Sequence, residues 1–113
     1  MSEWSDSVGL GDELSRDQAI GMLTFYCKTL KRLGYRPQPF RDIDARVGTN
    51  IYSAGKFEVM NHALWMCDET AKFIQQNRLA KAYRWIGMIQ GILFMGGVFS
   101  IVELKEHNAR GVS

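Results

Sequence analysis

The side chains best suited to bind a ligand are basic, and most of them lie in one segment. Residues 28–46 contain six basic side chains and two acidic ones. Guanidinium groups form paired hydrogen bonds with phosphate oxygens, and the rings of Tyr35, Tyr52 or Trp65 can stack on a base. The pattern predicts a site for an anion, a nucleotide or a nucleic acid. Its candidate residues are Lys28, Lys31, Arg32, Arg36, Arg41, Arg46, Lys81 and Arg84.

A solvated surface is the competing interpretation of these charges. Residues 1–17 contain five acidic side chains and one basic one, so this acidic arm could fold near the basic segment. Runs of surface charge usually serve solvation, and exposed ion pairs contribute little free energy. The formal net charge of +2 is also too small to require a polyanionic partner.

Catalytic motifs are not recognisable in the sequence. Glu58 lies four residues before His62, but one such pair is far short of a metal site, and neither His62 nor His107 belongs to a recognisable metal-binding motif. The sequence has no Ser–His–Asp order, phosphate-binding glycine loop or paired-carboxylate motif. We therefore expect a protein that is not an enzyme, with no metal and no cofactor.

Cysteine usage and the first residues indicate the compartment. Cys27 and Cys67 are far apart, and each lies inside an apolar helical pattern, which is typical of reduced core thiols. Residues 1–11 are polar and acidic, unlike the basic and then apolar start of a signal peptide. Both observations favour a cytoplasmic location.

Helices must position the candidate residues, because apolar side chains recur at helical spacing through most of the chain. A capping box of Ser15 and Gln18 opens a helix that ends near Gly34. Residues 35–52 form a long connection, and connections of this length often carry function. Ser53 can cap a second helix over residues 54–76.

The second half of the chain predicts two more helices. The polar break at 75–78 is short, so the helix that follows it should run antiparallel to the preceding one. Ser100 and Glu103 form a second capping box, which opens a short last helix through about Asn108. We therefore predict an all-α fold. Its parts are a flexible acidic arm at 1–14, one helical domain at 15–108 and a disordered tail at 109–113.

The apolar surface of the second helix predicts self-association. Its two adjoining apolar stripes cover roughly 200° of the helix, about twice the stripe that one partner needs. The third helix has an outer face of small and apolar residues, and glycines spaced by four let another helix approach closely. Trp65 lies among polar residues and is a separate contact candidate. The predicted interface of the homo-oligomer is Val59, Ala63, Met66, Phe73, Gly87, Met88, Gly91 and Met95.

Residues 85–102 could instead cross a membrane, because they hold no charge over 18 residues, the lower limit for a span. Gly96 and Gly97, followed by the capping Ser100, divide this stretch into a helix end and a new start. Such a break in hydrocarbon would leave backbone groups unsatisfied. We therefore expect no membrane association, although a small membrane protein is kept as an alternative.

Three stretches of the last half, residues 61–69, 81–91 and 103–108, resemble small helical proteins of tailed bacteriophages, most clearly in the run from Arg84 to Gly91. The resemblance implies a protein made in an infected bacterium and favours a role in taking over the host or countering its defences. It supplies no functional residues. The leading hypothesis is a non-enzymatic, homo-oligomeric protein that blocks or sequesters a host component. Nucleotide or nucleic-acid binding is the alternative.

Overall fold

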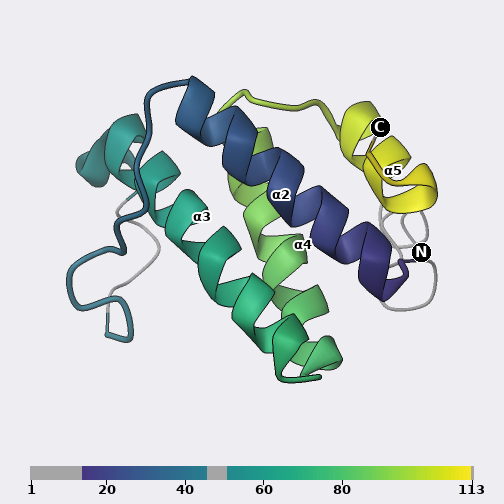
Figure 1. Cartoon of the computed structure of the whole chain (residues 1–113). Helices are drawn as coiled ribbons and strands as arrows, with labels where there is room; N and C mark the ends of the chain where they lie inside the picture. The colour runs from purple at the N-terminus through teal and green to yellow at the C-terminus, as the bar shows by residue number, and fades with distance from the viewer. Residues whose placement is uncertain (1–13, 46–50, 113) are drawn as a thin grey trace, which may run out of the picture.

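Four helices make up the part of the chain that the computed structural model describes, residues 14–45 and 51–112. They are α2 (Arg16–Arg32), α3 (Ile51–Gln75), α4 (Leu79–Met95) and α5 (Ile101–Arg110). These ranges contain no strand, which confirms the all-α prediction. Figure 1 shows α2 lying across α3 and α4, with α5 beside the first half of α2. The predicted acidic arm lies outside the described residues, except for the buried Leu14.

The start of α2 matches the predicted capping box. The Gln18 amide donates to Ser15 Oγ at 3.1 Å, and the Ser15 amide donates to Gln18 Oε1 at 2.9 Å. The helix ends before Gly34, whose φ of 99° favours glycine. One side of α2 is buried against the rest of the molecule, as the periodicity predicts. The buried residues are Ala19, Met22, Leu23, Tyr26 and Leu30.

The helix α3 lies at the centre of the fold and packs against both α2 and α4. Its helical geometry is interrupted at Gly55, with φ 84° and ψ 157°, so its continuous part begins after Gly55 and not at Ala54. Both of its apolar stripes are used inside the chain. Val59, Ala63 and Met66 are at most 4% exposed, so their assignment to an oligomer interface is wrong. The wide apolar arc is explained by neighbours within one chain.

The uncharged stretch 85–102 divides as predicted. The helix α4 ends at Met95, and Gly97 follows with a φ of 76°. The Glu103 amide then donates to Ser100 Oγ at 3.1 Å, which opens α5. Within residues 14–45 and 51–112, no helix is long and apolar enough to cross a membrane. The helix α5 extends to Arg110, two residues beyond its predicted end, and the half-buried Val112 packs on the core.

A buried polar network joins α5 to the core. Gln90 and Asn108 are each 1% exposed and exchange two hydrogen bonds, Gln90 Nε2 to Asn108 Oδ1 at 2.8 Å and Asn108 Nδ2 to Gln90 Oε1 at 3.2 Å. Gln90 Nε2 also lies 3.0 Å from the Tyr26 hydroxyl, which is 2.8 Å from His107 Nδ1. These four side chains connect α2, α4 and α5. Buried polar groups that satisfy one another in this way fix one relative placement of the helices.

Candidate functional site

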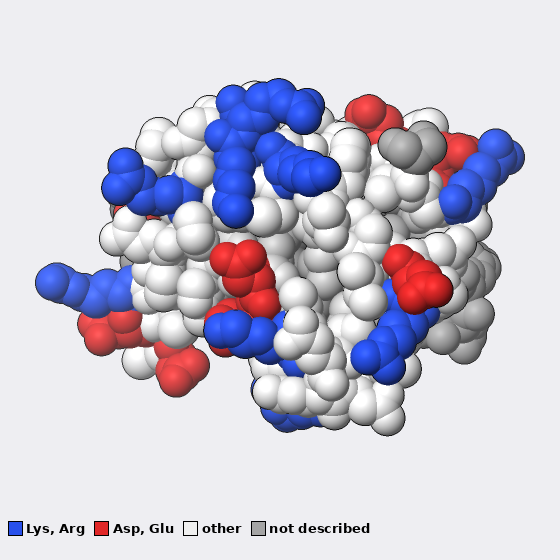
Figure 2. All heavy atoms as spheres, in the orientation of Figure 1, with Lys and Arg blue, Asp and Glu red and all other residues white. Residues whose placement is uncertain are grey.

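The structure distributes the basic candidate residues over separate surfaces. Lys28 and Lys31 line a groove of about 290 Å³ between α2 and α3, which also contains Cys27, Cys67 and Asp68. Arg32 is exposed at the end of α2, and Arg84 is exposed on α4. Figure 2 shows lysine and arginine side chains gathered over the C-terminal end of α2. Lys28 and Lys31 therefore line one groove together, and Arg32 and Arg84 are not part of its lining.

The remaining basic candidates differ in their surroundings. Lys81 is half-buried, and its Nζ lies 4.5 Å from the centroid of the Phe73 ring, where Arg78 also packs at 5.3 Å. Its charge therefore interacts with an aromatic ring of its own chain. Arg46 lies outside the described residues. Arg36 and Arg41 belong to the linker (residues 35–45) between α2 and α3, and both line a hollow.

This linker hollow has a volume of about 540 Å³. Its lining combines guanidinium, amide, carboxylate and aromatic groups, so it can offer both charge and a ring to a small molecule. The Phe57 ring is 58% exposed and packs edge-on against Tyr35 at 5.2 Å between centroids. The lining residues are Arg36, Gln38, Pro39 and Arg41 of the linker and Phe57, Glu58 and Asn61 of α3.

Two buried polar residues of α3 hold the linker in place. Asn61 Oδ1 accepts from the Arg36 amide at 3.0 Å, and the Asn61 carbonyl accepts from the Gln38 amide at 3.2 Å. His62 Nδ1 accepts from the Phe40 amide at 3.1 Å, and the two rings stack at 4.5 Å. Helical spacing places Asn61 and His62 outside the apolar stripes of α3, among its polar residues. The linker instead covers them, leaving them 7% and 3% exposed.

A row of aromatic side chains crosses the packing interface between α3 and α4 and includes the contact candidate Trp65. Trp65 lies 5.3 Å from His62 and 6.1 Å from Trp85, and Phe73 meets Trp85 edge-on at 4.9 Å. Trp65, Phe73 and Trp85 are half-buried. Trp65 is therefore packed by its own chain with part of its ring accessible, and Phe73 belongs to the same intramolecular row.

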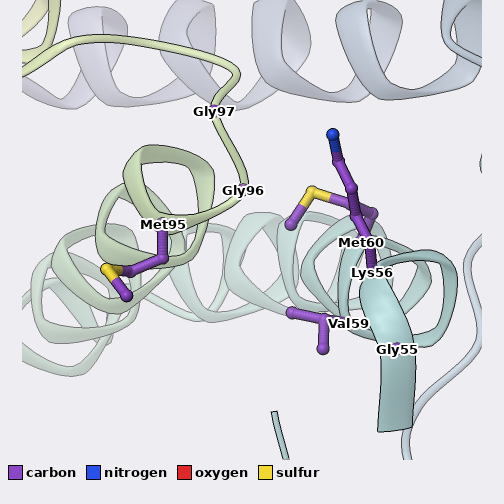
Figure 3. Close-up of a pocket in the computed structure, with 7 residues that line it drawn as sticks. All are labelled: Gly55, Lys56, Val59, Met60, Met95, Gly96 and Gly97. Carbon is purple, nitrogen blue, oxygen red and sulfur yellow. The ribbon is translucent and has the colours of Figure 1, made fainter. Parts of the chain in front are cut away.

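The outer face of α4 retains the other half of the predicted interface. Met88 is 60% exposed and Met95 62%, and Gly87 and Gly91 are half-buried on the same side. A Cβ atom placed on Gly91 would have no neighbour within 4 Å. The end of this face adjoins a groove of about 400 Å³ (Figure 3). Its lining residues are Gly55, Lys56, Val59 and Met60 of α3 and Met95, Gly96 and Gly97.

The polar network around Gln90 was not predicted from the sequence, because its members are up to 81 residues apart. Burial raises the pKa of the Tyr26 hydroxyl above its ordinary value and lowers the pKa of His107. A neutral His107 can accept a hydrogen bond from the Tyr26 hydroxyl at Nδ1, which agrees with both pKa shifts. Burial likewise raises the pKa of Cys67, which keeps it protonated as a core thiol.

Comparisons with known proteins add no constraint on the function. No protein-family model matches the chain, and no curated protein or solved structure is significantly similar to it. Among residues 14–45 and 51–112, no group of three or more His, Cys, Asp or Glu side chains could hold a metal ion. The two features that remain as candidate sites are the outer face of α4 and the linker hollow.

Proposed function

We propose that this chain is a non-enzymatic binding protein that forms homo-oligomers through the outer face of α4. In this proposal it is encoded by a phage and acts in the cytoplasm of the infected bacterium, where it blocks or sequesters a host component. The observation that carries the self-association is the smooth apolar face formed by Gly87, Met88, Gly91 and Met95.

The spacing of these residues suits a helix-to-helix contact. Gly87, Gly91 and Met95 follow one another at intervals of four, and Met88 and Met95 are seven apart, so all four residues lie on one side of α4. Glycines let two helix backbones approach, and flexible methionines can fill the irregular space beside them. In a symmetric dimer the same face would be used twice.

Because Val59, Ala63 and Met66 are buried, the proposed interface is limited to residues of α4. The proposed monomer pairs α3 and α4 in an antiparallel arrangement, and that pairing together with α2 uses the apolar arc of α3. In this proposal a second chain is needed only to cover the exposed apolar face of α4. The methionine face would also provide an adaptable surface for a host protein, because methionine side chains adjust to different partners.

The experiment is light scattering after size exclusion on the full chain and on two charge variants. Met88→Lys combined with Met95→Lys should convert the oligomer to a monomer, because four buried cations would oppose a symmetric contact. Val102→Lys is the matched control, since Val102 is 69% exposed on α5, and it should leave the mass unchanged. A full chain that is monomeric at micromolar concentration would refute the self-association.

The host-binding part requires a separate test. The tagged full chain should retain a discrete bacterial protein from lysate, and the Met88→Lys, Met95→Lys variant should lose it if the same face is used. Reconstitution of that complex from two purified proteins would establish the interaction. If no bacterial protein forms such a complex, the sequestering role is wrong, whatever the oligomeric state.

A further inference from the structure

We infer that the linker hollow is a binding site for a mononucleotide. Arg36 and Arg41 would hold the phosphate, and the ring of Phe57 would stack on the base. This site is independent of the proposed self-association, because none of its lining residues lies on α4. Of the basic residues in segment 28–46, the proposed site uses only Arg36 and Arg41. It adds the ring of Phe57, which was not among the aromatic residues considered from the sequence.

The hollow is held in shape before any ligand arrives. Three hydrogen bonds from linker amides end on Asn61 and His62, which are both buried. Pro37 and Pro39 further restrict the linker, because the proline ring fixes φ. A preformed site loses less conformational entropy on binding than a free loop does. The linker is therefore more than a connection between α2 and α3.

The phosphate end is defined by Arg36 and Arg41, which are both exposed and line the same hollow. Guanidinium groups match phosphate oxygens in charge and in geometry, because each can donate two parallel hydrogen bonds. Lys28 and Lys31 line a different groove, beside Asp68. The linker hollow is thus the described cavity whose lining includes two arginines.

The base end is defined by Phe57. Its ring is 58% exposed, and Tyr35 supports it from the side at 5.2 Å with an interplanar angle of 65°. A ring that is held in this way offers a face for stacking, which is worth about 1–3 kcal/mol per base in single-stranded nucleic-acid complexes. The exposed phenyl ring and the arginines belong to one lining, so one ligand can contact both.

The remaining lining selects a nucleotide over a simple anion. Gln38 places an amide in the hollow, which can accept hydrogen bonds from ribose hydroxyls or base amines, and the Glu58 carboxylate is part of the same lining. A carboxylate would weaken the binding of a bare polyanion. The volume of about 540 Å³ falls within the range of small-ligand pockets, roughly 300–1,000 Å³, and suits one nucleotide better than a strand.

The test is titration of the ¹⁵N-labelled full chain with AMP, GMP, CMP and UMP, their nucleosides and inorganic phosphate. At least one nucleotide should shift the backbone amide signals of Arg36, Gln38 and Phe57. It should bind about tenfold more tightly than its nucleoside or phosphate. Arg36→Gln and Arg41→Gln should each weaken binding by about tenfold or more, the usual effect of losing a charged hydrogen bond. Phe57→Ala should weaken it as well.

Two controls separate this site from general electrostatics and from assembly. Arg16→Gln removes one exposed positive charge at the other end of α2 and should leave the affinity unchanged. The Met88→Lys, Met95→Lys variant should bind the nucleotide as the original chain does. Failure of any nucleotide to move the three amide signals would overturn the inference. So would equal affinity for inorganic phosphate, equal weakening by Arg16→Gln, or displacement of the nucleotide by an oligoglutamate peptide.

Discussion

A substitution at Gly91 should affect the stability of the single chain and the assembly of the oligomer in opposite directions. It lies in the interior of α4 at a half-buried position, and a Cβ atom there would meet nothing within 4 Å. The Cβ atom of Gly91→Leu should therefore fit the single chain without a clash, and the exposed side of α4 is open to the rest of the side chain. Glycine in a helix interior is about 0.8–1.0 kcal/mol less favourable than alanine, and leucine is close to alanine. The free energy of unfolding of the monomer should rise by about 0.5–1 kcal/mol.

Assembly should respond in the opposite direction. If a second α4 approaches at Gly91, the leucine side chain must separate the two backbones. The expected result is a stabilised monomer by urea denaturation and a lost oligomer by light scattering. Gly21→Leu is the matched control, because Gly21 is also a half-buried glycine inside a helix with no atom within 4 Å of a Cβ. It should give the same gain in stability and leave the oligomer intact.

Two outcomes would contradict the predicted effect of Gly91→Leu. An oligomer that persists in Gly91→Leu with an unchanged dissociation constant would exclude close backbone approach at Gly91. A large loss of stability in the monomeric variant would show instead that a neighbour within the chain already occupies the space. Gly91→Ala provides the intermediate case and should weaken assembly less than leucine does.

Three further predictions concern the interior and the linker. Gln90→Leu should lower the free energy of unfolding by about 2–4 kcal/mol, because the buried Asn108 amide loses its two hydrogen bonds to Gln90. Adding Asn108→Leu should recover most of this free energy in a double-mutant cycle measured by urea denaturation. Simple additivity of the two substitutions would contradict the prediction. The folded-state pKa of His107 is lowered by burial among Phe25, Tyr26 and Phe99, although Glu103 acts to raise it. The unfolded state then binds more protons, so stability should fall as pH drops below the ordinary histidine value of 6.5, and His107→Gln should flatten that dependence in denaturant midpoints measured across this range. Asn61→Ala should speed hydrogen exchange at the Arg36 amide, which loses its acceptor, while the Phe40 amide stays protected by His62; equal acceleration at both would show that the linker opens as a unit.

Local features of the sequence were sufficient to predict the helices. The capping boxes at Ser15 and Ser100 were predicted correctly, because a capping side chain bonds to an amide only three residues away. The end of α4 at Met95 follows from the glycines next to it. The start of α3 was less accurate, since Gly55 interrupts the helix through its own backbone conformation, which no periodicity reveals.

The candidate sites depended on contacts between distant segments. Periodicity shows that α3 has two apolar stripes, but it does not show whether they meet helices of the same chain or of another. Val59, Ala63 and Met66 were assigned to an interface for that reason, and the structure buries them. Asn61 and His62 look solvated on a helical wheel, yet the linker that they hold precedes them by more than 20 residues.

The sequence by itself determined the helical class, the helix caps and the division of residues 85–102 into two helices, because those properties follow from interactions within a few residues. Only the tertiary structure decided which polar residues are buried together and which apolar face stays open. It paired Gln90 with Asn108 and Tyr26, and it placed Phe57 and the arginines of the linker in the lining of one hollow. Among the described residues, it left the space around a Cβ atom on Gly91 open. These outcomes depend on how the helices pack, which residue spacing alone does not specify.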